Sequence, residues 1–314
     1  MAPFTKTDSI WMNGELLPWA EANVHVSAHA LQYGTGVFEG MRSYDTPDGP
    51  AIFRLEAHMK RLIASASFYE LKIPYSVEEL CDAALDVLRA NRLENAYFRP
   101  LAFFDSYSFS VWPKDCPVSV AIIAVPGRAY LQGGPEQGVR VTVSTVKRIE
   151  SSTLPPHIKA SGHYTNSVLA VQEAIRRGYD DALLFNAKGD ISEGSGANLF
   201  IVRDGTLITN DIGESILPGI TRDTVLQIAR DLNLPIVIRP MPLADVQTAD
   251  EAFFCGTAVE VTPIREVDGR AVGDGQPGPM TQRIQRVFYD AVHGRLPQYR
   301  RWLSTAAPVL ELTK

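Results

Sequence analysis

Lys159 is the residue around which the chemistry of this chain can be organised. It stands in the stretch SSTLPPHIKASGHYTN (151–166), after a Pro-Pro corner and before an amphipathic segment that predicts a helix. Loops held by a rigid scaffold often carry catalytic residues. A lysine whose charge is suppressed by desolvation can form a Schiff base with an aldehyde. Most lysines are solvated surface groups, so this interpretation depends on the rest of the chain.

Three other stretches have the composition of a cofactor site. In ISEGSGANLF (191–200), Glu193 is either a turn acid or a carboxylate that keeps the ring nitrogen of a pyridine cofactor protonated. The segment ILPGIT (216–221) leads into a predicted helix, whose first N–H groups form an anion site, and Thr221 suits a helix cap and hydroxyl donor. In FFCGTAVEVT (253–262), a strand end exposes backbone donors and a hydroxyl that suit a phosphate or carboxylate. Capping alone, or an ordinary turn, would explain the last two.

The N-terminal half carries residues that suit a substrate. Tyr97 and Arg99 stand two residues apart on an apolar predicted strand and therefore share a face, which suits a carboxylate ligand or a structural salt bridge. The glycine-rich stretch 28–45 does not have dinucleotide-binding spacing, and we interpret it as a tight bend that brings Tyr33 and Phe38 to a pocket wall. Arg61 lies within a predicted helix and is a surface charge unless an anion is bound nearby.

Local patterns predict the elements that position these residues. Asn13-Gly14 predicts a hairpin turn between 10–12 and 16–19, and Ser76-x-x-Glu79 predicts a capping box at a helix start. We expect further helices over 55–71, 76–91, 164–177, 221–233 and 279–293, and strands over 96–104, 118–125, 139–146, 181–186, 197–203, 236–240 and 251–255. The mixture of hairpins and helices favours α+β layers.

The length of 314 residues suits two domains. The glycine-rich, polar segment 127–138 predicts their boundary, with a smaller domain over 1–126 and a larger, cofactor-binding domain over 139–314.

Composition excludes several classes of partner. The net charge of −6 contains no long run of one sign, which argues against nucleic acid and anionic membranes. No stretch approaches the ~20 apolar residues of a membrane span, and the N-terminus has no pattern of a secretory signal. Three cysteines without a CxxC pair suit a reducing cytoplasm, and His157 and His163 have no common ligand spacing, so we expect no metal site.

Taken together and in order, these segments resemble the branched-chain amino acid aminotransferases, pyridoxal-phosphate enzymes of fold type IV. The similar blocks span nearly the whole chain: HALQYGTGVFEG, MKRL, AYFRP, SSTLPPHIKASGHYTNSVLA, DISEGSGANLF, SILPGITRDTVL and GTAVEVTPIREVDG. The resemblance implies a two-domain α+β fold, bound pyridoxal 5′-phosphate and a homodimer. It also implies a ping-pong transamination between leucine, isoleucine or valine and 2-oxoglutarate.

The resemblance also implies a role for each site residue. Lys159 would be the Schiff-base lysine and proton shuttle, Glu193 the partner of the pyridine nitrogen, and Tyr164 the partner of the ring oxygen. Leu217 would pack against the cofactor ring. The phosphate would be held by Arg61, Ile220, Thr221 and Thr257. The substrate pocket would comprise Tyr33, Phe38, Gly40, Tyr97, Arg99, Tyr130, Thr257 and Ala258.

The chain departs from the family pattern in two places. The segment Phe104–Pro113, FDSYSFSVWP, contains no glycine where the family has a Gly-Met-Gly loop that contributes to the neighbouring subunit's pocket, which affects the expected substrate range. Cys255 replaces a common methionine. D-amino acid and (R)-amine transaminases and aminodeoxychorismate lyases are the alternative activities, and a non-catalytic cofactor-binding homologue is another class. The AYFRP block favours the branched-chain enzyme.

Overall fold

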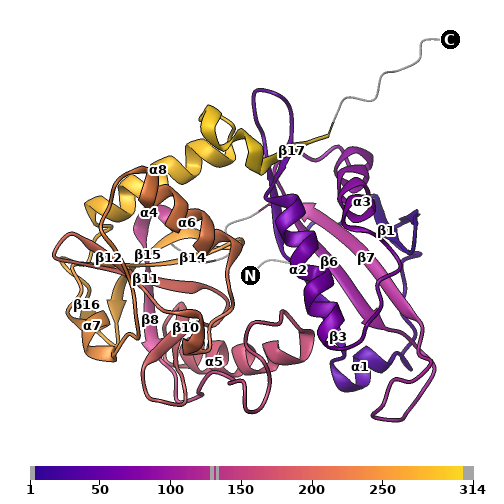
Figure 1. The fold of residues 1–314 in the computed structure, drawn as a ribbon, viewed down its shortest axis with the longest axis horizontal. Helices are drawn as coiled ribbons and strands as arrows, with labels where there is room; N and C mark the ends of the chain where they lie inside the picture. The colour runs from indigo at the N-terminus through magenta and orange to yellow at the C-terminus, as the bar shows by residue number, and fades with distance from the viewer. Residues whose placement is uncertain (1–3, 128–130, 132–133, 307–314) are drawn as a thin grey trace. The chain divides into compact units, whose positions relative to one another are not determined.

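The computed structural model describes residues 4–127, 131 and 134–306 (Figure 1). The chain folds into two compact units, the first formed by Met1–Arg128 with Asp290–Lys314 and the second by Ala129–Tyr289. The first division between the units, after Arg128, lies within the segment 127–138. The C-terminal end differs from the expectation, because β17 (Leu303–Thr305) pairs with β5 (Ala51–Phe53) and so completes the first unit.

Among the described residues, the first unit holds an eight-stranded sheet with the order β17-β5-β4-β6-β7-β1-β2, and β3 also pairs with β6. Its other elements are β1 (Ser9–Met12), β2 (Glu15–Pro18), α1 (His29–Tyr33), β3 (Gly36–Phe38), β4 (Met41–Tyr44), α2 (Leu55–Phe68), α3 (Val77–Ala90), β6 (Ala96–Phe104), β7 (Val118–Pro126) and the 3-10 helix η3 (Pro297–Trp302). Helices α2 and α3 pack against this sheet.

The second unit holds a nine-stranded sheet in its described residues, with the order β10-β9-β8-β15-β14-β11-β12-β13 and with β16 beside β15. Its strands are β8 (Val139–Val143), β9 (Asp181–Phe185), β10 (Ile191–Gly194), β11 (Asn198–Arg203), β12 (Thr206–Thr209), β13 (Ile236–Ile238), β14 (Glu251–Gly256), β15 (Glu260–Val267) and β16 (Arg270–Ala271). Its helices are α4 (Gly134–Gln137), η1 (Ser161–His163), α5 (Tyr164–Arg176), η2 (Ile212–Glu214), α6 (Ile220–Asp231), α7 (Leu243–Gln247) and α8 (Pro279–Val292), which extends past the division.

The second sheet is buried between two apolar layers. Alternation along β9 sends Ala182 and Leu184 toward α5, whereas Leu183 joins the larger core cluster with residues such as Leu199 and Phe254. Helix α5 packs against β8 and β9, and α6 packs against β13 and β14 (Figure 1). The burial of both faces explains why the strands are nearly continuous apolar runs.

Local sequence signals are confirmed where they are strongest. Ser76 accepts a hydrogen bond from the Glu79 backbone, and the Glu79 carboxylate accepts one from the Ser76 N–H, as the capping-box pattern predicts. Asn13 and Gly14 both have positive φ in the β1–β2 hairpin. The mixed helices and sheets confirm the α+β class. The stretch 28–45 is more regular than the predicted bend, because it forms α1, β3 and β4.

Within the described residues, no helix is both long and apolar enough to span a lipid bilayer. The same part of the chain contains no group of three His, Cys, Asp or Glu side chains that could hold a metal ion.

Candidate active site

Lys159 lies in the loop before η1 and α5, as the sequence predicts, and its side chain is half-buried. Its Nζ donates a hydrogen bond of 2.6 Å to the Tyr164 hydroxyl, which belongs to the first residue of α5. The buried His163 ring forms a hydrogen bond of 3.1 Å through Nδ1 with the Ile158 carbonyl. This contact joins the residue before Lys159 to the end of η1 and so restrains the loop. An amine and a phenol are therefore held together at the start of a helix.

Glu193 is the centre of a buried polar cluster on β10. Its Oε1 lies 2.9 Å from Arg148 Nε, an ion pair in which the N–H is not aligned for a hydrogen bond. Its Oε2 accepts hydrogen bonds from Asn198 Nδ2 (2.9 Å) and from the Leu217 N–H (3.1 Å). Burial raises the pKa of the Glu193 carboxyl above its ordinary value, while the Arg148 and Lys159 charges act in the opposite direction. The carboxyl is thus poised to stabilise a nearby positive charge.

Asn198 connects this acid to the loop before α6. Its amide donates to both Glu193 Oε2 and the Leu217 carbonyl, each at 2.9 Å. A Cβ at Gly219 would meet Asn198 Oδ1 at 2.0 Å, so only glycine lets the loop approach this closely. Asn198 and Arg148 were not among the site residues predicted from the sequence. Asn198 could have been noticed because its amide follows the glycine-rich turn after Glu193. No local pattern distinguishes Arg148 from a surface arginine.

The N-terminus of α6 has the features of an anion site. Gly219, with extended backbone angles, is the N-cap and no side chain caps the helix. The prediction that Thr221 caps the helix is wrong, because Thr221 is the second helical residue. It is buried, as is Ile220. Thr257 and Ala258 follow β14 in a half-buried turn, beside the strand that carries Asn198. Since no side chain of the described residues caps α6, its first N–H groups suit an anionic ligand.

These groups fit pyridoxal 5′-phosphate. A buried carboxylate suits a protonated ring nitrogen, an amine suits an aldehyde, and an uncapped helix N-terminus suits a phosphate. The close approach at Gly219, and at Gly194, where a Cβ would meet Phe254 at 2.6 Å, brings backbone rather than side chains to the site.

The substrate-side residues that were predicted from β6 form one cluster in the first unit. Arg99 Nη2 donates to the Tyr97 hydroxyl at 3.0 Å, and its guanidinium lies 4.6 Å from the centre of the Phe38 ring. Gly40 is required beside them, since a Cβ there would meet the Tyr97 hydroxyl at 2.3 Å. Arg99 Nε is buried without a hydrogen bond, and in the part of the chain described no carboxylate pairs with Arg99.

Arg61 is neither a solvated charge nor free. Its Nε donates to Glu39 Oε1 (2.6 Å) and its Nη2 to Glu39 Oε2 (2.9 Å), and His58 Nδ1 lies 2.7 Å from the same carboxylate. Glu39 is fully buried, and although its burial opposes ionisation, Arg61 and His58 hold the pKa of its carboxyl well below its usual range. Glu39 and His58 were not identified from the sequence.

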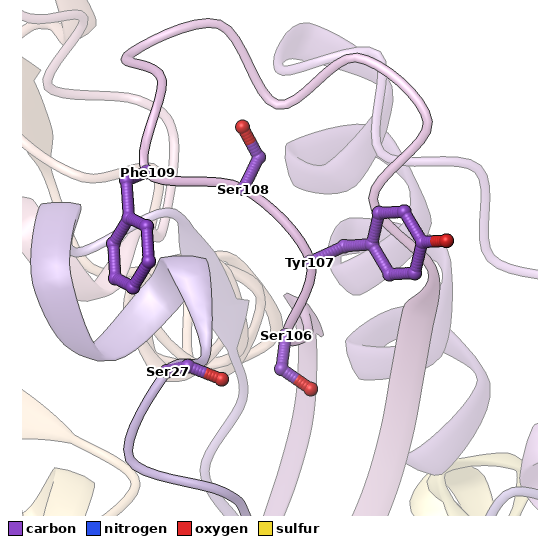
Figure 2. A pocket seen from close by; sticks show the side chains of 5 residues that line it. All are labelled: Ser27, Ser106, Tyr107, Ser108 and Phe109. Atoms are coloured by element: carbon purple, nitrogen blue, oxygen red, sulfur yellow. The ribbon is translucent and has the colours of Figure 1, made fainter.

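Tyr33 ends α1, and its hydroxyl donates to the Phe109 carbonyl at 2.8 Å in the unusual loop 104–113. The buried His29 ring holds the same loop through the Ser110 carbonyl at 2.9 Å. Tyr107 and Phe109 are about four-fifths exposed, and Figure 2 shows their rings directed to opposite sides of the loop. An open cavity of about 280 Å³ is lined by Ser27, Ser106, Tyr107, Ser108 and Phe109. Tyr130, the remaining predicted pocket residue, lies outside the described residues.

The class of protein follows from comparison with known families. Residues 36–267 match the family described as amino-transferase class IV, which covers most of the chain and includes Lys159 and Glu193. The chain therefore belongs to the class IV aminotransferases, within their branched-chain group. A branched-chain-amino-acid aminotransferase of Pseudomonas aeruginosa is 43% identical over 93% of this chain and 95% of its own length.

Solved structures agree with this assignment. The structure of the Escherichia coli branched-chain amino acid aminotransferase has a TM-score of 0.94 and 43% identity, covering 96% of this chain and 100% of its own. The branched-chain amino acid aminotransferase of Thermobaculum terrenum, solved in its PLP-bound holo-form, has a TM-score of 0.90 and 38% identity, covering 96% of this chain and 99% of its own.

Proposed function

We propose that this chain is a pyridoxal-phosphate-dependent transaminase that moves the amino group between branched-chain L-amino acids and 2-oxoglutarate. The observation that carries the proposal is the pairing of Lys159 with Tyr164 beside the buried, three-partner carboxylate of Glu193. The branched-chain enzymes to which it is similar favour this activity over the D-amino acid, (R)-amine and lyase alternatives.

The second unit would hold the cofactor. When bound, pyridoxal 5′-phosphate supplies an electron sink for the electron pair left at the substrate Cα. Glu193 would hold the ring nitrogen protonated, Tyr164 would bond the ring oxygen, and Leu217 would pack against the ring. Lys159 Nζ would hold the cofactor and move the proton at the substrate Cα. Phosphate would be bound by Ile220, Thr221, Thr257 and Arg61, the last already held by Glu39.

The two substrates of the proposed reaction have different side chains, and one pocket must accept both. Aromatic walls suit the apolar side chain of leucine, isoleucine or valine, whereas Arg99 suits the distal carboxylate of glutamate or 2-oxoglutarate. The absence of a protein carboxylate on Arg99, within the described residues, supports this role. In the same proposal, Tyr33, Phe38, Gly40, Tyr97, Tyr130, Thr257 and Ala258 shape the pocket.

We also propose that the chain acts as a homodimer in the cytoplasm. Exposed apolar side chains on and around the loop 104–113 support self-association: Val26, Leu31, Tyr107, Phe109, Val111 and Trp112 are 68–81% exposed. Light scattering with size exclusion would test this, and a monomer at micromolar concentration would contradict it.

The activity is tested by a half-reaction panel. The coloured, cofactor-loaded protein is mixed with single L- and D-amino acids, and the visible absorbance of the bound cofactor is followed. We expect conversion with L-leucine, L-isoleucine, L-valine and L-glutamate, and none with their D-forms. Conversion by D-amino acids alone would support the alternative activity, and no conversion with any amino acid would overturn the proposal.

A further inference from the structure

The turn that carries Glu193 is tied to the sheet by a second buried pair. The Ser195 hydroxyl donates to Asp181 Oδ1 at 2.5 Å, and the Ala182 N–H donates to the same oxygen at 2.8 Å. Asp181 is 2% exposed and Ser195 is 7% exposed. Asp181 begins β9 and has the same strand phase as the core residue Leu183, so its carboxyl lies on the apolar side of the sheet.

This pair lies at the tip of the turn between Glu193 and Asn198. The Gly194 N–H donates to the Ala197 carbonyl at 2.8 Å, which leaves Ser195 and Gly196 as the two residues of the tip. Glu193 and Asn198 stand on either side of that closing bond and are joined by their own hydrogen bond. The register of β10 against β9 shifts between Ile191 and Glu193, and beyond that shift Glu193 pairs with Leu184 and Gly194 with Leu183, at the end of the strand from which the turn departs.

We propose that Asp181 and Ser195 are positioning residues for Glu193: their buried hydrogen bond fixes the turn that sets where the carboxylate meets its ligand. A buried acid is costly unless it is compensated, and an apolar pair would fill the same space without that cost. The inference rests on the proposed function, because it assigns Glu193 to the ring nitrogen of the cofactor.

Few charged groups act on the Asp181 carboxyl among the described residues. Burial raises the pKa of the Asp181 carboxyl to about 6, the Ser195 and Ala182 hydrogen bonds act in the opposite direction, and the neighbouring Asp180 charge raises it further. Asp180 itself accepts from the Arg140 backbone N–H at 2.7 Å, and the Arg140 guanidinium pairs with Glu266 at 2.9 Å. Among the described residues, Ser195 supplies the side-chain hydrogen bond to the Asp181 carboxyl.

The test compares Ser195→Ala with Ser144→Ala in the holoenzyme. Ser144 is a matched control, because it is equally buried and its hydroxyl donates to the Glu173 carboxylate at 2.7 Å, away from the turn. For Ser195→Ala we expect about tenfold faster cofactor loss on dialysis, a shift of at least about 0.5 in the pH midpoint of the bound cofactor's absorbance, and a lower kcat with little change in KM. Ser144→Ala should show none of these changes.

Asp181→Asn, alone and with Ser195→Ala, completes a double-mutant cycle. The amide keeps an acceptor for Ser195, so we expect a smaller effect than that of Ser195→Ala and a clearly non-additive double variant. Equal absorbance midpoints and cofactor loss in Ser195→Ala and Ser144→Ala would overturn the proposal, as would strict additivity. If wild-type protein binds the cofactor but converts no amino acid, the proposed function fails, while cofactor loss and the absorbance midpoint still decide the role of the pair.

Discussion

Lys159 is half-buried and bonded to Tyr164, so its amine is neither a free surface charge nor sealed in the core. A residue that must both hold a cofactor and exchange a proton needs this intermediate position, because the substrate has to reach it. The contact between His163 and the Ile158 carbonyl restrains the loop around it. The amine is therefore held by contacts within the seven residues Ile158–Tyr164.

Replacing Lys159 with alanine removes the only group proposed for both tasks. We expect Lys159→Ala to lose the visible band of covalently held cofactor and at least about 100-fold of the transamination rate. Absorbance spectra and single-turnover rates check this. Lys188→Ala is the control, since Lys188 is 66% exposed in the same unit and pairs only with Glu214 among described residues. Full turnover by Lys159→Ala would end this interpretation.

Asp181 gives a pH signature that is independent of catalysis. Its pKa is raised from 3.8 to about 6 by burial, so the folded protein binds the proton more tightly than the unfolded chain. The stability that this group contributes is present below about pH 4 and is lost as the pH rises through about 6. Because asparagine does not titrate, we expect the unfolding free energy of Asp181→Asn relative to wild type to rise by about 3 kcal/mol over that window.

Urea unfolding of both proteins at several pH values between about 3.5 and 7.5 measures this difference. A constant offset between the two proteins at every pH would show that Asp181 does not titrate in the folded state.

At the scale of elements, β6 is what brings the substrate-side residues together. Its alternation puts Tyr97 and Arg99 on one face, where they meet Phe38 from β3. The pairing of β3 with Ala102 and its neighbours sets this meeting, because Phe38 lies opposite Leu101 in the register. The guanidinium of Arg99 is thereby stacked on an aromatic ring, where the proposed substrate carboxylate would meet it.

Removing this guanidinium should separate the two half-reactions. For Arg99→Ala we expect the glutamate half-reaction to fall at least about tenfold relative to the leucine one, a difference of about 1.4 kcal/mol, because only glutamate brings a distal carboxylate. Single-turnover rates with each amino acid decide it. Parallel falls would make Arg99 structural, and a loss confined to leucine would reverse the assignment.

At the scale of the whole molecule, the C-terminal segment belongs to the first unit. Tyr299 of η3 is 2% exposed and stacks on Trp302 at 4.5 Å, and the Trp302 carbonyl accepts from the Arg54 N–H at 2.6 Å. Strand β17 then pairs with β5. The first sheet is therefore completed by residues that follow the second unit in sequence.

We expect Tyr299→Ala to destabilise the first unit by roughly 3–5 kcal/mol, because it leaves a large cavity beside the Trp302 ring. Tyr107→Ala is the matched control, since Tyr107 is 81% exposed in the same unit and should change stability by less than about 0.5 kcal/mol. Hydrogen exchange of the β5 amides reports on the first unit directly. Unchanged β5 protection in Tyr299→Ala would contradict the packing role of this segment.

Local chemistry alone determined much of this protein. The Asn13-Gly14 turn, the Ser76–Glu79 capping box and the alternation of β6 are each set by residues a few positions apart, so the sequence predicted them. The placement of Lys159 before a helix follows in the same way. The motif blocks, in their order along the chain, indicated the family. Thr221 shows the limit, because the N-cap of the helix is Gly219, two residues before the position that the capping chemistry of Thr221 suggested.

Tertiary structure alone decided the groups that surround those residues. Arg148 reaches Glu193 across 45 positions of sequence, Asp181 holds Ser195 across a sheet edge, and Arg61 is bound by a buried Glu39 rather than by solvent. Such pairs stabilise a charge only where burial has removed water, and burial is a property of the packed chain. No local pattern indicates which distant residue will pair with a buried charge. The acid, the amine and the helix could therefore be predicted from the sequence, whereas their partners are determined by the tertiary structure.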